Sequence, residues 1–92
     1  FLSCEPLLGE LGELNLDGIN WIIVGGESGS QARPMKEEWV LNIKRQADAN
    51  NIPFFFKQWG TWSEDGIKSN KKINGKLLQG KIVQNMPYVN RK

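Results

Sequence analysis

The sequence predicts an α/β fold built from parallel strands and one helix. Three short apolar segments, at residues 1–5, 21–24 and 54–56, are bounded by proline, glycine or polar residues and indicate strands. Unbroken apolar strands are typical of parallel sheets, which are covered on both faces. A helical pattern at residues 37–50 separates the second strand from the third, and this order predicts a strand–helix–strand unit with a right-handed crossover.

The first predicted strand, residues 1–5, ends at Pro6. A chain that opens inside a strand is what we expect of a segment of a longer protein. The connection up to Leu16 alternates leucines with glycines and acids. Because glycine disfavours a long helix, we expect either a short helix or an extended crossover there. Asp17-Gly18 is a turn signal before the second strand.

The predicted helix has one apolar face, whose members recur at helical spacing: Trp39, Val40, Ile43 and Ala47. Glu37 and Glu38 fall in the first turn, where the helix dipole favours negative charge. Asn50-Asn51 can end the helix in the left-handed conformation. The third strand then starts after Pro53 and is closed by Gly60.

The chain changes character near Gly60, where we place a soft boundary between residues 1–60 and a basic tail, residues 61–92. Residues 1–66 contain all ten acids and five bases, a net charge of −5. Residues 67–92 contain seven bases and no acid, a net charge of +7. These opposite charges should attract each other at contact range.

The tail also contains turn signals at Asn74-Gly75 and Gln79-Gly80, with Lys76-Leu77-Leu78 between them. This spacing predicts a short β-hairpin or meander. The tail has too many apolar residues for a purely solvated segment. We therefore expect at least residues 76–86 to form short strands that pack on the acidic body.

The composition excludes several kinds of chemistry within this chain. With no histidine and one cysteine, the chain cannot build a Ser–His or Cys–His pair, a Cys/His zinc site or an internal disulfide. Cys4 is expected to be a small buried apolar residue. No apolar run approaches the roughly 20 residues that span a bilayer, so we expect no membrane contact and a cytoplasmic location.

Each predicted strand ends in polar residues, and the carboxyl ends of parallel strands share one edge of a sheet. We therefore expect Glu5, Glu27 and Lys57 to converge there. No metal site and no catalytic residue is predicted. The predicted ligand-binding residues are Glu5, Gly25, Gly26, Glu27, Ser28, Arg33, Lys57 and Gln58.

Several of these residues have two interpretations. Residues 25–30 are rich in glycine but lack the lysine and the spacing of a phosphate-binding loop. The glycine pair either admits a ligand to the backbone or forms a tight turn. Arg33 either clamps a carboxylate or phosphate, or is a solvated loop residue. Trp59 and Trp62 either wall a pocket for a flat ring or close the end of the fold.

Four segments in this order resemble one known family: Phe1–Gly9, Trp21–Gly29, Ala32–Met35 and Pro53–Gly60. They are similar to the C-terminal part of the phage gp-thirty-seven/gp-sixty-eight protein family, found in phages, prophages and bacterial genomes. That family in turn resembles radical S-adenosylmethionine (SAM) enzymes. The resemblance implies a fragment of a partial (β/α) barrel with a small β-rich tail. It also implies a [4Fe–4S] cluster held by cysteines of the N-terminal half.

The resemblance further implies that this segment contributes the surface that binds SAM or substrate, and that it is inert without the other half. Glu5 or Glu27 would then accept hydrogen bonds from the amine or ribose hydroxyls. Lys57 or Arg33 would pair with the carboxylate. The backbone beside Gly25-Gly26 would bind the adenine edge. The expected partners are the N-terminal half, an unassigned substrate and a second copy of the chain, because uncovered sheet edges associate.

The chain departs from the family at two positions: Lys36 stands where an aspartate would cap the helix, and Gln79 stands where an acid precedes Gly80. Two other functions stay open. The basic residues 67–92 would give a salt-dependent attraction to nucleic acid. A structural phage component would keep the fold without chemistry.

Overall fold

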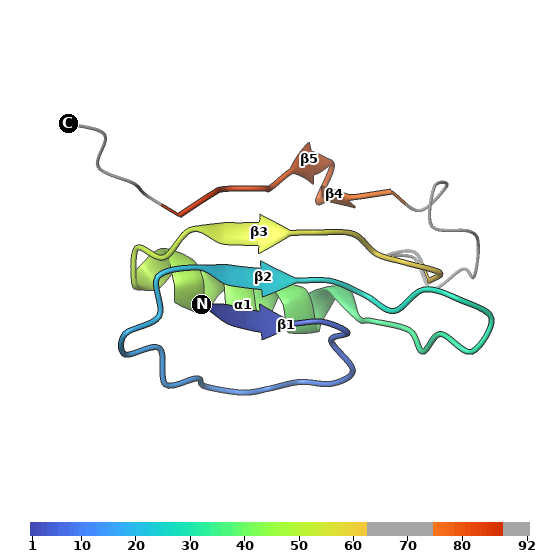
Figure 1. Cartoon of the computed structure of the whole chain (residues 1–92), viewed down its shortest axis with the longest axis horizontal. Helices are drawn as coiled ribbons and strands as arrows, with labels where there is room; N and C mark the ends of the chain where they lie inside the picture. Colours follow the sequence, from blue (N-terminus) through green and yellow to red (C-terminus); the bar gives the residue numbers. More distant parts are fainter. Residues whose placement is uncertain (63–74, 88–92) are drawn as a thin grey trace.

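The computed structural model describes residues 1–62 and 75–87 of the chain. Strands β1 (Leu2–Cys4), β2 (Ile22–Val24) and β3 (Phe54–Phe56) form a parallel sheet in the order β1-β2-β3 (Figure 1). The prediction of an α/β fold with parallel strands is therefore confirmed. The first two strands are shorter than predicted.

Helix α1 (Glu37–Ala49) connects β2 to β3 and lies behind the sheet in Figure 1, which makes the crossover right-handed as expected. Three of the four residues predicted for its apolar face are fully buried: Val40, Ile43 and Ala47. The fourth, Trp39, is half-buried and packs at the margin of the core. Asn51 follows the helix with φ 56°, in the left-handed region as predicted. Within the described parts of the chain, no helix is long and apolar enough to cross a membrane.

The core lies between the sheet and α1, and aromatic residues of the third strand fill much of it. Phe54 and Phe56 are almost completely buried, and Trp59 beyond the strand is 2% exposed. The rings of Phe56 and Trp59 meet edge to face, with centroids 5.2 Å apart. Trp59 is thus a core residue and not the wall of a ligand pocket. Trp62 is half-buried, and its Nε1 donates a hydrogen bond to the Ala32 carbonyl at 2.8 Å.

The connection between β1 and β2 is an extended crossover without helix or strand. Helix α1 holds it through two side chains. Gln46 Nε2 donates to the Gly12 carbonyl at 2.8 Å, and Gln46 Oε1 accepts from the Leu14 amide at 2.8 Å. Asn42 Nδ2 also donates to the Gly12 carbonyl, at 3.2 Å. Leu7 and Leu16 of the crossover are buried in the common core. Of the two alternatives for this segment, the extended crossover is therefore the one observed.

The tail forms a hairpin of β4 (Leu77–Leu78) and β5 (Lys81–Ile82), which confirms the predicted hairpin. Its two turn residues, Gln79 and Gly80, have φ values of 51° and 78°. Positive φ at both positions is the type I′ geometry that matches the twist of two-residue hairpins. Leu78 is 2% exposed and belongs to the core of the α/β body.

Residues 83–85 follow the hairpin and cover the outer edge of β3. The Phe56 amide donates to the Val83 carbonyl at 2.7 Å. The Asn85 amide donates to the Phe54 carbonyl at 3.1 Å, so this short antiparallel pairing extends a parallel sheet. The described part of the tail therefore packs on the body, as predicted. Most of the predicted basic tail before the hairpin, residues 63–74, lies outside the described residues, and the boundary at Gly60 stays a prediction.

Helix α1 begins without a side-chain cap. Lys36 occupies the N-cap position with φ −85° and ψ 139°, and its side chain makes no capping hydrogen bond. Its Nζ lies 5.8 Å from the centroid of the Trp39 ring. The amides of the first turn therefore lack the acceptor that serine, threonine, aspartate or asparagine would provide.

We expect Lys36→Asp to raise the free energy of unfolding by about 0.5–1 kcal/mol. The carboxylate supplies the missing acceptor, and this gain outweighs the exposed cation–π contact that is lost. Urea unfolding followed by tryptophan fluorescence measures the change. Lys36→Ala is the control, since it removes the lysine without adding a cap, and an equal gain in both variants would contradict the capping argument.

Leu78 and Leu77 form a matched pair for testing how the tail is anchored. We expect Leu78→Ala to lower the free energy of unfolding by about 2–4 kcal/mol, because the side chain is buried in the shared core. Leu77→Ala removes the same atoms from a side chain that is 49% exposed, and we expect a change within about 0.5 kcal/mol. Urea denaturation compares the two, and similar losses would mean that the hairpin is not anchored through Leu78.

Candidate functional site

The carboxyl ends of the three strands meet at one edge of the sheet, called here the carboxyl edge. The strand register places Glu5, Gly25 and Lys57 in one row directly after the last strand residues. Hydrogen bonds continue the ladder into this row: the Gly25 amide donates to Cys4 at 3.3 Å, and the Lys57 amide donates to Val24 at 2.8 Å. Because Gly25 has no side chain, the side chains of Glu5 and Lys57 can meet across the middle strand.

These two side chains form an exposed ion pair. Lys57 Nζ lies 3.1 Å from Glu5 Oε2, and Gln58 Nε2 lies 3.4 Å from the same oxygen. The side chains of Lys57 and Glu5 are 49% and 26% exposed. Exposed ion pairs of this kind contribute about 0–1 kcal/mol to stability. A ligand with one positive and one negative group can therefore replace the contact between Glu5 and Lys57 with little loss of stability.

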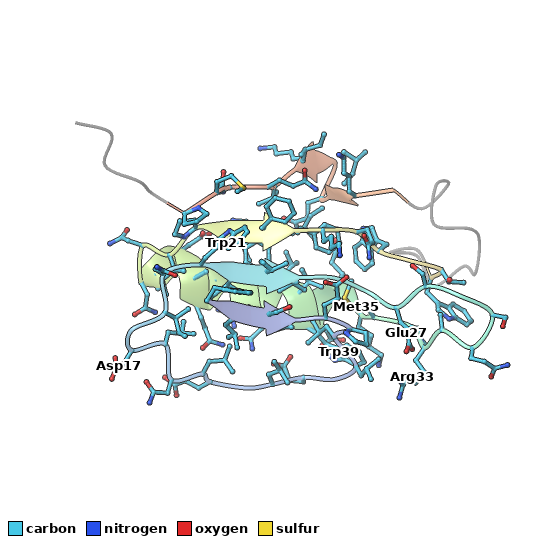
Figure 2. The ribbon with its side chains drawn as sticks, viewed as in Figure 1. Asp17, Trp21, Glu27, Arg33, Met35 and Trp39 are labelled. Atoms are coloured by element: carbon cyan, nitrogen blue, oxygen red, sulfur yellow. The ribbon has the colours of Figure 1, made fainter. Side chains whose placement is uncertain are left out.

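Glu27 is engaged within its own loop, the segment of residues 27–33. Its carboxylate accepts from Arg33 Nε at 3.0 Å, from Arg33 Nη2 at 3.1 Å and from the Arg33 amide at 3.0 Å. Figure 2 shows the two side chains together. The side-chain hydrogen bond from Arg33, followed by the one from its backbone, holds the pKa of Glu27 below its ordinary value. Of the two roles considered for Arg33 from the sequence, it therefore clamps a carboxylate, and that carboxylate belongs to Glu27 of the same loop.

The residues after β3 hold the same loop from the other side. The Thr61 amide donates to the Glu27 carbonyl at 3.0 Å. The Thr61 hydroxyl accepts from the Gly29 amide at 2.9 Å and lies 3.2 Å from the Gly29 carbonyl. Thr61 is 9% exposed, so these bonds are shielded from water. The loop therefore has a fixed shape at the carboxyl edge.

The second glycine of the pair is required by the protein backbone itself. A Cβ on Gly26 would collide with the carbonyl oxygen of Trp59, and a Cβ on Gly60 would collide with the carbonyl oxygen of Glu27. Gly60 also has φ 87°, which L-residues rarely adopt. The carbonyl of Trp59 therefore makes a close backbone approach at Gly26.

A hollow of about 320 Å³ opens at the carboxyl edge and is lined by Glu5, Pro6, Gly26, Glu27, Ser28, Lys57 and Gln58. It brings together six of the eight predicted site residues. Gly25 stands in the row that carries the ion pair, and Arg33 is absent from the lining because it pairs with Glu27. Pro6 was missed by the sequence analysis, although its place directly after Glu5 was a usable signal. The volume is at the small end of the range for ligand pockets, about 300–1,000 Å³.

Cys4 is buried beside this edge and is 8% exposed. Burial raises the pKa of its thiol, which keeps it protonated and a poor nucleophile. The expectation of a buried apolar cysteine is therefore confirmed. Across residues 1–62 and 75–87, no three histidine, cysteine or carboxylate side chains gather where a metal ion could bind.

The two glycines of the pair should differ sharply when each is replaced by alanine. We expect Gly26→Ala to lower the free energy of unfolding by more than about 3 kcal/mol or to prevent folding, because backbone must move to admit the methyl group. Gly25→Ala places its Cβ 3.3 Å from the Glu5 carboxylate, a side-chain end that can shift, so we expect a loss below about 1 kcal/mol. Circular dichroism and urea unfolding make the comparison, and equal losses would contradict the proposed contact at Gly26.

Comparison with known proteins gives one family. No curated protein and no solved structure matches the chain. The model of the family described as "Protein of unknown function (DUF5131)" matches residues 1–87, nearly the whole chain. The chain therefore belongs to the DUF5131 family.

Proposed function

We propose that this chain forms the carboxyl-edge ligand surface of a cytoplasmic, radical-SAM-like protein of phage or prophage type. On this proposal it binds the amino-acid part of S-adenosylmethionine, or a substrate with the same charges. The observation that carries the proposal is the exposed ion pair of Lys57 and Glu5, 3.1 Å apart above a hollow of about 320 Å³. The choice of S-adenosylmethionine as cofactor rests on four sequence segments that resemble the phage family in the same order.

The residues present suit a zwitterionic ligand. The Lys57 ammonium can bind a carboxylate, and the Glu5 carboxylate can bind an ammonium group or a ribose hydroxyl. Gln58 adds an amide that reaches both the Glu5 carboxylate and the Gly26 carbonyl. The hollow is too small and too open to enclose a whole nucleoside-containing ligand, so this surface would contact one part of it. S-adenosylmethionine, when bound, supplies a sulfonium centre for group transfer or radical formation.

The residues of this chain do not suit the iron–sulfur cluster. Cluster iron is bound mainly by cysteine thiolates, and the chain has one cysteine, which is buried with its pKa raised. We therefore assign the cluster to the N-terminal half and derive no step through it from this chain. The chain's own contribution is to bind and orient a charged ligand.

Two features of the sheet support a partial (β/α) barrel. The strands are parallel with sequential order, and α1 covers one face. The other face carries Trp21, Ile23 and Phe55, which are half-buried, with the Trp21 and Phe55 rings 5.9 Å apart. An apolar face opposite the helix layer is what the interior of a barrel requires. The N-terminal half of the protein is the partner that would cover it.

Titration of the isotope-labelled chain with S-adenosylmethionine tests the proposal. We expect amide shifts at Glu5, Gly26 and Lys57, and at least tenfold weaker binding by Lys57→Met, because a hydrogen bond to a charged group is worth about 1.5–3 kcal/mol. Lys44→Met is the matched control, since Lys44 pairs with Asp48 on the helix, away from this edge.

The outcomes separate the competing functions. Absence of shifts with S-adenosylmethionine, S-adenosylhomocysteine and methionine would contradict the proposal. Salt-sensitive binding to DNA or RNA, lost on replacing Lys76 and Lys81 but kept in Lys57→Met, would favour the nucleic-acid alternative. If neither S-adenosylmethionine nor nucleic acid binds, a structural phage component is the function that remains.

A further inference from the structure

The hairpin β4–β5 carries exposed apolar and basic side chains. Leu77 and Ile82 are register partners on β4 and β5 and are 49% and 60% exposed. Cross-strand partners lie side by side, so the two form one apolar patch. Lys76 and Lys81 are the exposed sequence neighbours of Leu77 and Ile82. Lys81 is the register partner of Leu78 and therefore projects from the other face of the two strands, so the lysines flank the apolar patch, and residues 67–92 contain no acid. We call these four residues the basic hairpin surface.

The crossover after β1 carries the opposite combination at residues 8–13. Leu8 and Leu11 are 40% and 46% exposed, and Glu10 and Glu13 lie between and after them. The hollow between this segment and α1 is lined by three acids, Glu10, Glu13 and Glu38, and by one base, Arg45, so the acids are in excess there. We call residues 8–13 the acidic segment.

The acidic segment is held in a fixed shape by α1. Glu10 Oε2 accepts from Asn42 Nδ2 at 2.6 Å and from the Gly12 amide at 3.0 Å. Glu13 has no such role, and it lines a hollow of about 680 Å³ between the segment and the helix, together with Glu38 and Arg45. A segment that is already ordered loses little conformational entropy when it binds.

The two surfaces cannot meet within one molecule. The acidic segment follows β1 and the basic hairpin surface lies beyond β3, at opposite edges of the sheet (Figure 1). Each surface has the charge and the exposed leucine or isoleucine side chains that the other would cover. The match of charge and of apolar area therefore points to a contact between molecules.

We propose that the chain associates head to tail with a second copy of itself, the basic hairpin surface of one copy binding the acidic segment of the next. Such a contact is heterologous, so it builds chains or rings and not only closed pairs. It is small and partly polar, which makes it weak and dependent on salt. The proposal is independent of the ligand site, because no residue of either surface lines the hollow at the carboxyl edge.

Sedimentation equilibrium of the chain at low and high salt tests the proposal. We expect the average mass to rise above 10.4 kDa as the concentration approaches the millimolar range at low salt, and to fall towards that value at high salt. We expect Lys76→Glu with Lys81→Glu to weaken association about tenfold or more, and Glu13→Lys to weaken it several-fold. An equimolar mixture of these two variants should recover association into pairs, because the unchanged hairpin of the Glu13→Lys variant can bind the unchanged acidic segment of the double variant.

Asp17→Lys is the matched control, since it makes the same charge change as Glu13→Lys on an exposed residue of the same crossover outside the acidic segment. It should associate like the original chain, and so should Lys57→Met. A chain that stays monomeric at millimolar concentration would overturn the proposal. So would association that the charge reversals leave unchanged, or a monomer that instead binds heparin through Lys76 and Lys81.

Discussion

The carboxyl edge of this protein depends on a contact between two backbones. After the last strand residues, the chain at Gly26 runs so close to Trp59 that no side chain fits between them. The Gly26 amide donates to the Gln58 carbonyl at 2.9 Å, and the Thr61 amide donates to Glu27 at 3.0 Å. The two segments thus stay paired beyond the regular sheet. This pairing fixes the position of the 27–33 loop relative to the sheet and directs the Trp59 side chain into the core.

The same contact separates the roles of the two nearby carboxylates. Glu27 lies past the glycine pair, where its loop turns back and presents three donors of Arg33 to it. Its charge is used to close that loop. Glu5 lies one strand away, and among the described residues its carboxylate is approached by the amine of Lys57 and the amide of Gln58, at 3.1–3.4 Å. Of the two acids, Glu27 is therefore bound by three donors of one residue within its own loop, whereas Glu5 is paired across the sheet with side chains that follow β3.

The strands, the helix and the hairpin were accessible from the sequence because each has a local signal. Examples are the apolar run before Gly25 and the positive-φ residues Gln79-Gly80 at the turn. The convergence of Glu5, Glu27 and Lys57 at the carboxyl edge followed from the parallel pairing of the strands alone. Which carboxylate Arg33 clamps did not follow from the sequence, because the contact with Glu27 depends on a loop shape that Thr61, 28 residues later, holds in place. Trp59 was ambiguous for a similar reason: an aromatic residue after a strand enters the core or the site according to backbone contacts that leave no pattern in the sequence.

The two edges of the sheet differ in how their backbone groups are paired. The edge of β3 is covered by residues 83–85, whose pairing is antiparallel. At β1, the Leu2 amide donates to Trp21 and the Cys4 carbonyl accepts from Gly25. Since backbone groups alternate along a strand, the amide and carbonyl of Ser3 must point away from β2. In the described residues no strand pairs with that side, and Ser3 is exposed. A further parallel strand can therefore join this sheet next to β1 without displacing any observed pairing.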